Sequence, residues 1–268
     1  MAPSHNEKSQ PDQQPQQKLP RKRRKDAGQP RWEDRDYYIL QWIGQQGIIR
    51  YDQLRRLLGR ESPEKHAWDA VLSPSATDNA ITRWEAKRLV NSAHLVPKEP
   101  KYYWLSTAGF QFVELDLPHY SPKRLDLPYL LVCNQIRLYI EQLNRTDEQE
   151  FGDFEYCTWI AQRELQQSDP ERKLHVPAAQ FVTQTRGQLA IEVVRTQEGA
   201  EAIMRAHATN TVYNEVWYFA LTEQLVLLDQ IREQLRRSGL DVSKIYTFNG
   251  DTIVAPTALP KRVRSKKR

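Results

Sequence analysis

Residues 75–107 read SATDNAITRWEAKRLVNSAHLVPKEPKYYWLST, and this stretch decides the fold of the first half of the chain. In residues 75–95, the apolar side chains of Ile81, Trp84, Leu89 and Leu95 predict a helix packed against a core. From Leu95 onwards the pattern changes to a strand, a basic turn with two prolines, and a second strand. We therefore expect a helix followed by a β-hairpin.

Two further helices are expected before this stretch. Residues 37–43 are densely apolar and are followed by Gly44 and Gly47, which predicts a first helix closed by glycine. Residues 48–60 repeat leucine at helical spacing and predict a short amphipathic second helix. Three helices followed by a hairpin are typical of a winged helix-turn-helix, so we predict this domain over residues 31–115.

The second half of the chain predicts a different architecture. Residues 116–128 hold three prolines among polar and basic residues, and we expect them to be a linker. Over residues 129–250 we expect a long helix, three strands and then alternating helices and strands, with QLAIEVVR (188–195) and VWYFAL (216–221) as buried strands. This order predicts a mixed sheet flanked by helices, so the chain as a whole belongs to the α+β class with an α/β second domain.

The net charge of +5 is concentrated at the ends of the 268-residue chain. Residues 1–31 carry +5 and residues 261–268 carry +6, which leaves −6 for the body between them. We expect residues 1–30 to be a disordered basic arm and residues 251–268 a disordered basic tail, because neither has enough apolar residues for a core. Both suit a polyanionic partner, although solubilising or localisation tails would look the same. Their cations are Arg21, Lys22, Arg23, Arg24, Lys25, Lys261, Arg262, Arg264, Lys266, Lys267 and Arg268.

Composition argues against a membrane or secreted protein. No apolar run approaches the roughly 18–20 residues needed to cross a bilayer, and the N-terminus lacks the apolar stretch of a secretory signal. Cys133 and Cys157 are the only cysteines, which suits a reducing cytosol and is too few for a zinc site of their own. We therefore expect a cytoplasmic protein without a membrane partner.

The predicted winged helix implies a surface for double-stranded DNA. Such domains place the third helix in the major groove and hold phosphates with the wing and the helix ends. Each candidate residue alone could belong to an ordinary solvated surface, but basic groups on the second helix, the third helix and the wing together favour DNA. A winged helix used for protein contact is the main alternative. The candidate DNA-contacting residues are Arg55, Arg56, Asn79, Thr82, Arg83, Lys87, Arg88, Lys98 and Lys101.

A second pattern resembles a weakened nuclease site. Nucleases of the PD…(D/E)xK type use carboxylates on a β-hairpin to hold Mg²⁺ and activate water, and a lysine to stabilise charge. HVPAA (175–179) and AIEVVR (190–195) take those places here, with Glu192 kept, Ala178 in place of the aspartate and Val194 in place of the lysine. We expect paired polar groups without a metal. This residual site comprises Glu164, His175 and Glu192.

Segments in both halves are similar to the replication-relaxation proteins of bacteria and plasmids, over about residues 35–250. The resemblance implies a winged helix fused to a restriction-endonuclease-like domain, with a part in plasmid replication and DNA relaxation. Family members usually read HxPDA where this chain reads HVPAA, so the departures fall at the metal site and leave the winged helix untouched. The segments that carry the resemblance are ILQWIGQQGIIRYDQLRRLLG, RLVNSAHLV, YYWLSTAGF, VCNQIRLYIE, RELQ, HVPAAQFV, QLAIEVVRT and EVWYFAL.

Three functions remain open at this point. The first is a double-stranded DNA-binding protein of a plasmid or mobile element, sequence-specific or sequence-tolerant, associated with the nucleoid or plasmid and without a cofactor. The second is a Mg²⁺-dependent nickase or nuclease that uses Glu192 and Glu164, and the third is a transcriptional regulator. A homodimer and contacts with replication or mobilisation proteins are further arrangements that the sequence leaves open.

Overall fold

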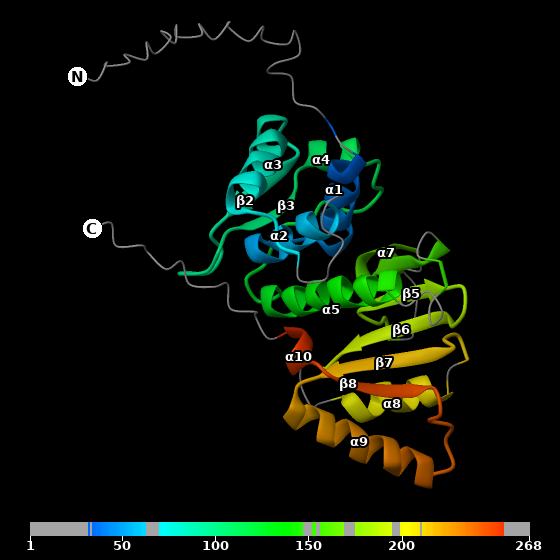
Figure 1. Ribbon diagram of the computed structural model, residues 1–268. Coiled ribbons are helices and arrows are strands. Elements are labelled where there is room, and N and C mark those ends of the chain that lie inside the picture. Colours follow the sequence, from blue (N-terminus) through cyan, green and yellow to red (C-terminus); the bar gives the residue numbers. More distant parts are fainter. Residues whose placement is uncertain are drawn as a thin grey trace, which may run out of the picture. The chain divides into compact units, whose positions relative to one another are not determined.

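The computed structural model describes residues 32, 34–62, 70–146, 152–153, 156–168, 175–194, 199–209 and 211–254. The chain from Trp32 onwards forms one compact unit. Its fold is of the mixed α+β type, because a three-stranded antiparallel sheet and a five-stranded mixed sheet both pack against helices (Figure 1). Among the described residues, no helix combines the length and apolarity that crossing a membrane demands.

The first half, which we define as residues 34–113, packs the helices α1 to α4 on the three-stranded sheet. The strands pair in the order β1-β3-β2, so the short β1 lies on the far side of β3 from β2. Trp42, Leu54 and Trp84, one from each of the first three helices, are fully buried in one hydrophobic core. The elements are α1 (Asp34–Gln46), β1 (Ile49–Arg50), α2 (Tyr51–Arg60), α3 (Pro74–Ala86), β2 (Val90–Ala93), β3 (Tyr102–Leu105) and α4 (Thr107–Phe112).

The third helix is shorter than the sequence predicts. α3 ends at Ala86, and the residues from Val90 pair with β3, so Leu95 lies beyond β2 rather than on a helix. Arg88 adopts a left-handed backbone (φ 56°), and the amide of the following residue, Leu89, donates a hydrogen bond to the carbonyl of Trp84. This is the hydrogen-bonded turn that commonly terminates helices, and it turns the chain into β2.

The glycines of the first helix also differ from expectation. Gly44 lies inside α1, and only Gly47 (φ 88°) follows the helix as its terminator. A Cβ atom on Gly44 would lie 2.6 Å from a methyl group of Leu115 and 2.8 Å from one of Leu105, so a larger residue here would require these leucine side chains to shift. The N-cap of α4 is Ser106, whose hydroxyl accepts from the backbone amide of Gly109.

The second half, which we define as residues 127–254, is built on the five-stranded sheet of order β4-β5-β6-β7-β8. β4, β5 and β6 pair antiparallel, whereas β6, β7 and β8 pair parallel, so the sheet is mixed, as predicted, and β6 is its central strand. The elements are α5 (Leu127–Thr146), β4 (Thr158–Ala161), α7 (Gln162–Ser168), β5 (Ala179–Thr183), β6 (Gly187–Val193), α8 (Ala200–Thr209), β7 (Glu215–Ala220), α9 (Thr222–Arg237), β8 (Ile245–Asn249) and α10 (Asp251–Val254).

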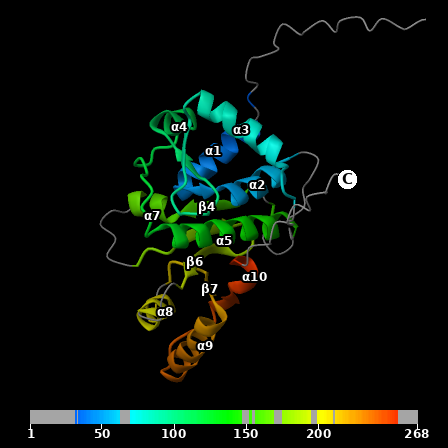
Figure 2. The ribbon, with the colours of Figure 1, turned by 90° about the vertical axis from the view of Figure 1, so that its left-hand side faces the viewer.

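Each face of this sheet has its own helices. Alternate side chains of β6 and β7, among them Ile191 and Trp217, pack with α5 and α10 on one face. The intervening side chains, among them Ala190 and Tyr218, pack with α8 and α9 on the other face. Figure 2 shows α5 on one side of β6 and β7, and α8 and α9 on the other.

Several boundaries in the second half differ from those predicted from the sequence. α5 begins at Leu127, inside the predicted linker 116–128, and α7 was not predicted as a helix. α10 occupies the first residues of the predicted tail 251–268. The rest of that tail, and the arm 1–30 with its cations, lie outside the described residues.

A buried ion cluster joins α1 and α2 to α5. Both oxygens of the Glu141 carboxylate accept hydrogen bonds, from Arg137 Nε (2.7 Å), Arg60 Nη2 (2.8 Å) and Trp42 Nε1 (3.2 Å). Arg60 is only 2% exposed, although arginine is rarely buried unless it is paired. Burial alone would raise the pKa of Glu141, but the charges of Arg137 and Arg60 lower that pKa to about 2. The cluster is therefore ionised at neutral pH.

Candidate functional site

The predicted recognition helix, α3, is anchored to α1 by a fully buried carboxylate. Asp36 accepts hydrogen bonds from Arg83 Nη2 (3.0 and 3.1 Å) and from Trp84 Nε1 (3.1 Å). Arg83 was expected to face DNA, yet its guanidinium is engaged within the fold. Arg83 therefore positions α3, and its charge is largely neutralised by Asp36.

The exposed side of α3 carries polar and acidic residues. Asn79 and Thr82 are exposed, as a role at base edges requires. Asp78 and Glu85 are exposed on the same helix, where they accept hydrogen bonds from the hydroxyls of Tyr51 and Ser92, both at 2.8 Å. The middle of α3 therefore offers hydrogen-bonding groups rather than positive charge.

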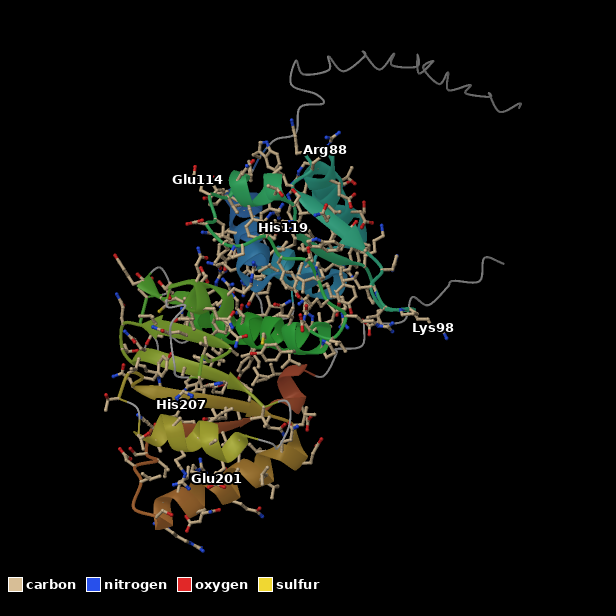
Figure 3. The ribbon with its side chains drawn as sticks, turned by 180° about the vertical axis from the view of Figure 1, so that it is seen from behind. Arg88, Lys98, Glu114, His119, Glu201 and His207 are labelled. Carbon is tan, nitrogen blue, oxygen red and sulfur yellow. The ribbon has the colours of Figure 1, made fainter. Side chains whose placement is uncertain are left out.

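Positive charge gathers instead at the end of α3 and along the hairpin. Lys87 and Arg88 follow the last helical residue, which corrects the expectation that they project from the helix itself. Lys98 adopts a left-handed backbone (φ 66°) in the turn between β2 and β3, and Lys101 precedes β3. All four side chains are exposed. Arg88 and Lys98 lie at opposite ends of the hairpin (Figure 3), so these cations border α3 without meeting at one point.

The two arginines of α2 differ from each other. Arg55 Nε donates to the carbonyl of Leu72 (2.9 Å), so this side chain helps to hold the segment that leads into α3. Arg56 is half-buried and forms no ion pair with any other described residue. Of the two, Arg56 keeps the more available charge.

The residual nuclease-like site is brought together only in part. Glu192 on β6 is 5% exposed, and its two oxygens are bonded by His175 Nε2 (3.1 Å) and His207 Nε2 (2.7 Å). Burial would raise the pKa of Glu192, but these two hydrogen bonds outweigh burial and lower its pKa below the ordinary range. Glu192 is thus a buried carboxylate held by two imidazoles.

Glu164 belongs to a different environment. One of its oxygens accepts from the amide of Ala161 (2.7 Å) at the start of α7, and the other accepts from Gln45 on α1 (3.1 Å). Glu164 therefore caps α7 and contacts α1, and it shares no partner with Glu192. Ala178 is buried where a nuclease would carry its aspartate, and no group of three or more potential ligands suited to a metal ion occurs among the described residues. The described side chains at this place do not form the Mg²⁺ site that the nuclease alternative needs.

His207 was missed by the sequence analysis. It lies on α8 on the same face as Ala200 and Met204, and all three are buried. A histidine at helical spacing from buried apolar residues is the signal that could have drawn attention to it, but its partner, Glu192, is distant in the sequence. Tyr218, directly opposite Glu192 in the β6–β7 register, was likewise assigned only to the core.

The two halves thus offer different chemistry. The first half has an exposed helix bordered by lysines and arginines, and the second half has a buried acid with two histidines. No protein-family model matches the chain, and no curated protein matches it either.

Proposed function

We propose that the first half is a winged helix-turn-helix that binds double-stranded DNA. The element order α1-β1-α2-α3-β2-β3, with strands ordered β1-β3-β2, carries this proposal, because it is the order of such domains. The second half is a degenerate restriction-endonuclease-like domain. The resemblance to replication-relaxation proteins supports a role in replication, relaxation or maintenance of a plasmid or mobile element, within the cytoplasm.

The polar and cationic groups then divide into two roles. With α3 in the major groove, Asn79 and Thr82 face base edges. Lys87 and Arg88 at the end of α3, and the hairpin lysines, reach phosphates on either side. Asp78 and Glu85 are negatively charged and repel a polyanion. Attraction to DNA therefore comes from the cations at the end of α3 and on the hairpin, and from the basic arm and tail.

The test is fluorescence anisotropy of a labelled duplex with the full-length protein. The double variants Lys87→Ala/Arg88→Ala and Lys98→Ala/Lys101→Ala should each weaken binding about tenfold or more, as the loss of phosphate contacts predicts. Arg236→Ala/Arg237→Ala on α9 removes two exposed charges from the other half and should change little. Equal affinity of all three variants and the wild type would refute the proposed interface.

The contribution of the basic arm and tail to DNA binding needs a separate test. In a full-length chain whose arm and tail cations are replaced by glutamine, binding should weaken but stay sensitive to the α3 and hairpin substitutions. If binding disappears in this background while the folded state is retained, the arm and tail alone hold DNA and the winged helix has another use.

The alternatives have weaker support. A Mg²⁺-dependent nickase needs carboxylates that converge, and Glu164 and Glu192 have separate partners. Nicking of supercoiled plasmid in Mg²⁺ that is lost in Glu192→Ala would establish it. A transcriptional regulator would use the same surface, and recovery of bound genomic fragments from promoters rather than from a replication origin would favour it.

A further inference from the structure

Two adjoining hollows open at the carboxyl ends of β6 and β7. Open sheets bind ligands beyond the carboxyl ends of their parallel strands, so this is a favourable place for a site. One hollow, of about 270 Å³, contains the polar groups His175, Glu192 and Tyr218. The other, of about 320 Å³, lies on the α5 face of the sheet. Both are lined by Tyr129, Val193 and Val194, so they lie next to each other near the end of β6.

The polar hollow has hydrogen-bonding capacity that the fold does not use. The Tyr218 hydroxyl is buried and forms no hydrogen bond with any other described residue. A buried hydroxyl without a partner is costly, and each such group calls for an explanation. Each oxygen of Glu192 accepts one histidine, although a carboxylate oxygen can accept two hydrogen bonds. A donor placed between Glu192 and Tyr218 would satisfy both groups.

The charge of the site limits what that donor can be. Neither lysine nor arginine occurs among the described residues that line the two hollows. With His175 and His207 in their neutral forms, the ionised Glu192 makes the site negative, so it repels phosphate or carboxylate groups and attracts a cation. His175 is the more exposed member of this pair, with 37% of its side chain accessible to solvent. A ligand would therefore reach Glu192 from the side of His175.

The second hollow suits an apolar group. Its walls are mostly aliphatic and aromatic, with contributions from α5, from the ends of β6 and β7, and from the start of α9. A ligand that filled both hollows would therefore need an apolar body and one positively charged, hydrogen-donating end. Among the residues that make the apolar wall are Val132, Ile136, Phe219 and Leu221.

We propose that the two hollows form one binding site for a small amphipathic amine, with its apolar body against α5 and its ammonium group between Glu192 and the Tyr218 hydroxyl. This site is separate from the DNA surface and does not depend on it. Calorimetric titration of the full-length protein with tryptamine, phenethylamine and hexylamine tests the proposal. Indole-3-propionate, which carries a carboxylate on the same ring as tryptamine, serves as the anionic counterpart and should not bind.

Three variants make the test specific. Tyr218→Phe and Glu192→Gln should each weaken binding of the best amine by about ten- to a hundredfold, the range expected for a hydrogen bond that involves a charged group. Glu201→Gln removes an exposed acid from α8, the helix that also carries His207 (Figure 3), and should leave binding unchanged. Tyr218→Phe deletes a hydroxyl that the described part of the fold leaves unsatisfied, so this variant should stay folded even where Glu192→Gln does not.

Three results would overturn the proposal. They are failure of all three amines to bind, binding of indole-3-propionate as tight as that of tryptamine, and wild-type affinity in Tyr218→Phe. A loss of amine binding in Tyr218→Phe with retention in Glu201→Gln would support it.

Discussion

At the scale of the residue, charged side chains in this protein do structural work inside the fold. Arg60 and Arg83 look like surface cations in the sequence, yet each is directed to a buried carboxylate, Glu141 or Asp36. A charge taken out of water is tolerated only when it is paired and hydrogen-bonded. These arginines therefore hold helices in place and contribute less positive charge to the surface than their number suggests.

The Glu141 cluster gives the largest expected stability effect of a single substitution. Glu141→Gln removes the counter-charge of the buried Arg137 and leaves the buried Arg60 with Glu61 as its remaining carboxylate, which should lower the free energy of unfolding by about 3–5 kcal/mol. Urea denaturation followed by circular dichroism measures this change. Glu233→Gln, which breaks exposed ion pairs with two arginines on α9, is the matched control and should have no measurable effect.

The same carboxylate predicts a pH dependence. The pKa of Glu141 is lowered from 4.5 to about 2 in the folded state, so its stabilising contribution is complete above pH 4.5. As the pH falls from 4.5 towards 2, the folded carboxylate resists protonation that the unfolded chain accepts, and the contribution is lost. The difference in unfolding free energy between wild type and Glu141→Gln should shrink over this window. A difference that stayed constant down to pH 2 would contradict the assignment.

At the scale of the element, the C-terminal ends of α9 and α3 show which helix ends can be predicted from the sequence. α9 ends just before Gly239 (φ 79°), and a glycine at this place marks the end of a helix in the sequence. α3 ends in the same kind of turn, but Arg88 stands where glycine is usual, so nothing in the sequence announces the end. The prediction therefore ran the helix on into β2. The two-residue β1 was missed for a related reason, since its pairing with β3 depends on distant residues.

The left-handed turn at Arg88 makes a testable contrast. Arg88→Gly and Arg88→Ala remove the same charge, but only glycine adopts this backbone without a steric cost. Arg88→Gly should be more stable than Arg88→Ala by about 1 kcal/mol, and the two should bind duplex DNA equally weakly. Thermal unfolding and the anisotropy assay measure the two properties. Unequal DNA binding would mean that the backbone, and not the charge, matters at this position.

At the scale of the whole molecule, the two sheets are coupled through α5. The side-chain amide of Asn134 donates to the backbone carbonyl of Ile48 (2.7 Å). The side-chain amide of Gln53 donates to the backbone carbonyl of Leu131 (2.8 Å). Together with the Glu141 cluster, these contacts join α5 of the second half to α1, α2 and the residue just before β1 in the first half. Composition suggested a proline-rich linker between separate bodies, but the partners that meet here are too far apart in the sequence for local patterns to reveal them.

Cooperative unfolding is the expected consequence of this coupling. Amide hydrogens of α2 and of β7 should exchange with the same opening free energy in the wild type, because neither half opens without breaking buried polar contacts. In Glu141→Gln the α2 amides should exchange faster than those of β7. Native-state hydrogen exchange read by mass spectrometry checks both statements. Independent exchange of the two halves in the wild type would argue that the contacts through α5 contribute little.

The candidate sites were predictable to different degrees. Asn79, Thr82 and the hairpin lysines are exposed as expected, because amphipathic spacing shows which side of an element faces water. The pairing of Glu192 with His175 follows from a β-hairpin that brings neighbouring segments together. His207 and the two hollows could not be found in this way, because they depend on how α8 and α5 pack on β6 and β7, elements that lie far apart in the sequence.

If the first half binds DNA as proposed, the Asp36–Arg83 contact affects the salt dependence and the lifetime of that binding. Each phosphate neutralised on a duplex releases condensed counterions, and the logarithm of affinity falls by about 0.9 per contact for each decade of salt. Because Arg83 is paired with Asp36, the proposed DNA surface would make few such contacts, so its binding should be short-lived and should depend only weakly on salt. Such a protein would be suited to scanning long stretches of DNA, pausing where Asn79 and Thr82 meet the right base edges.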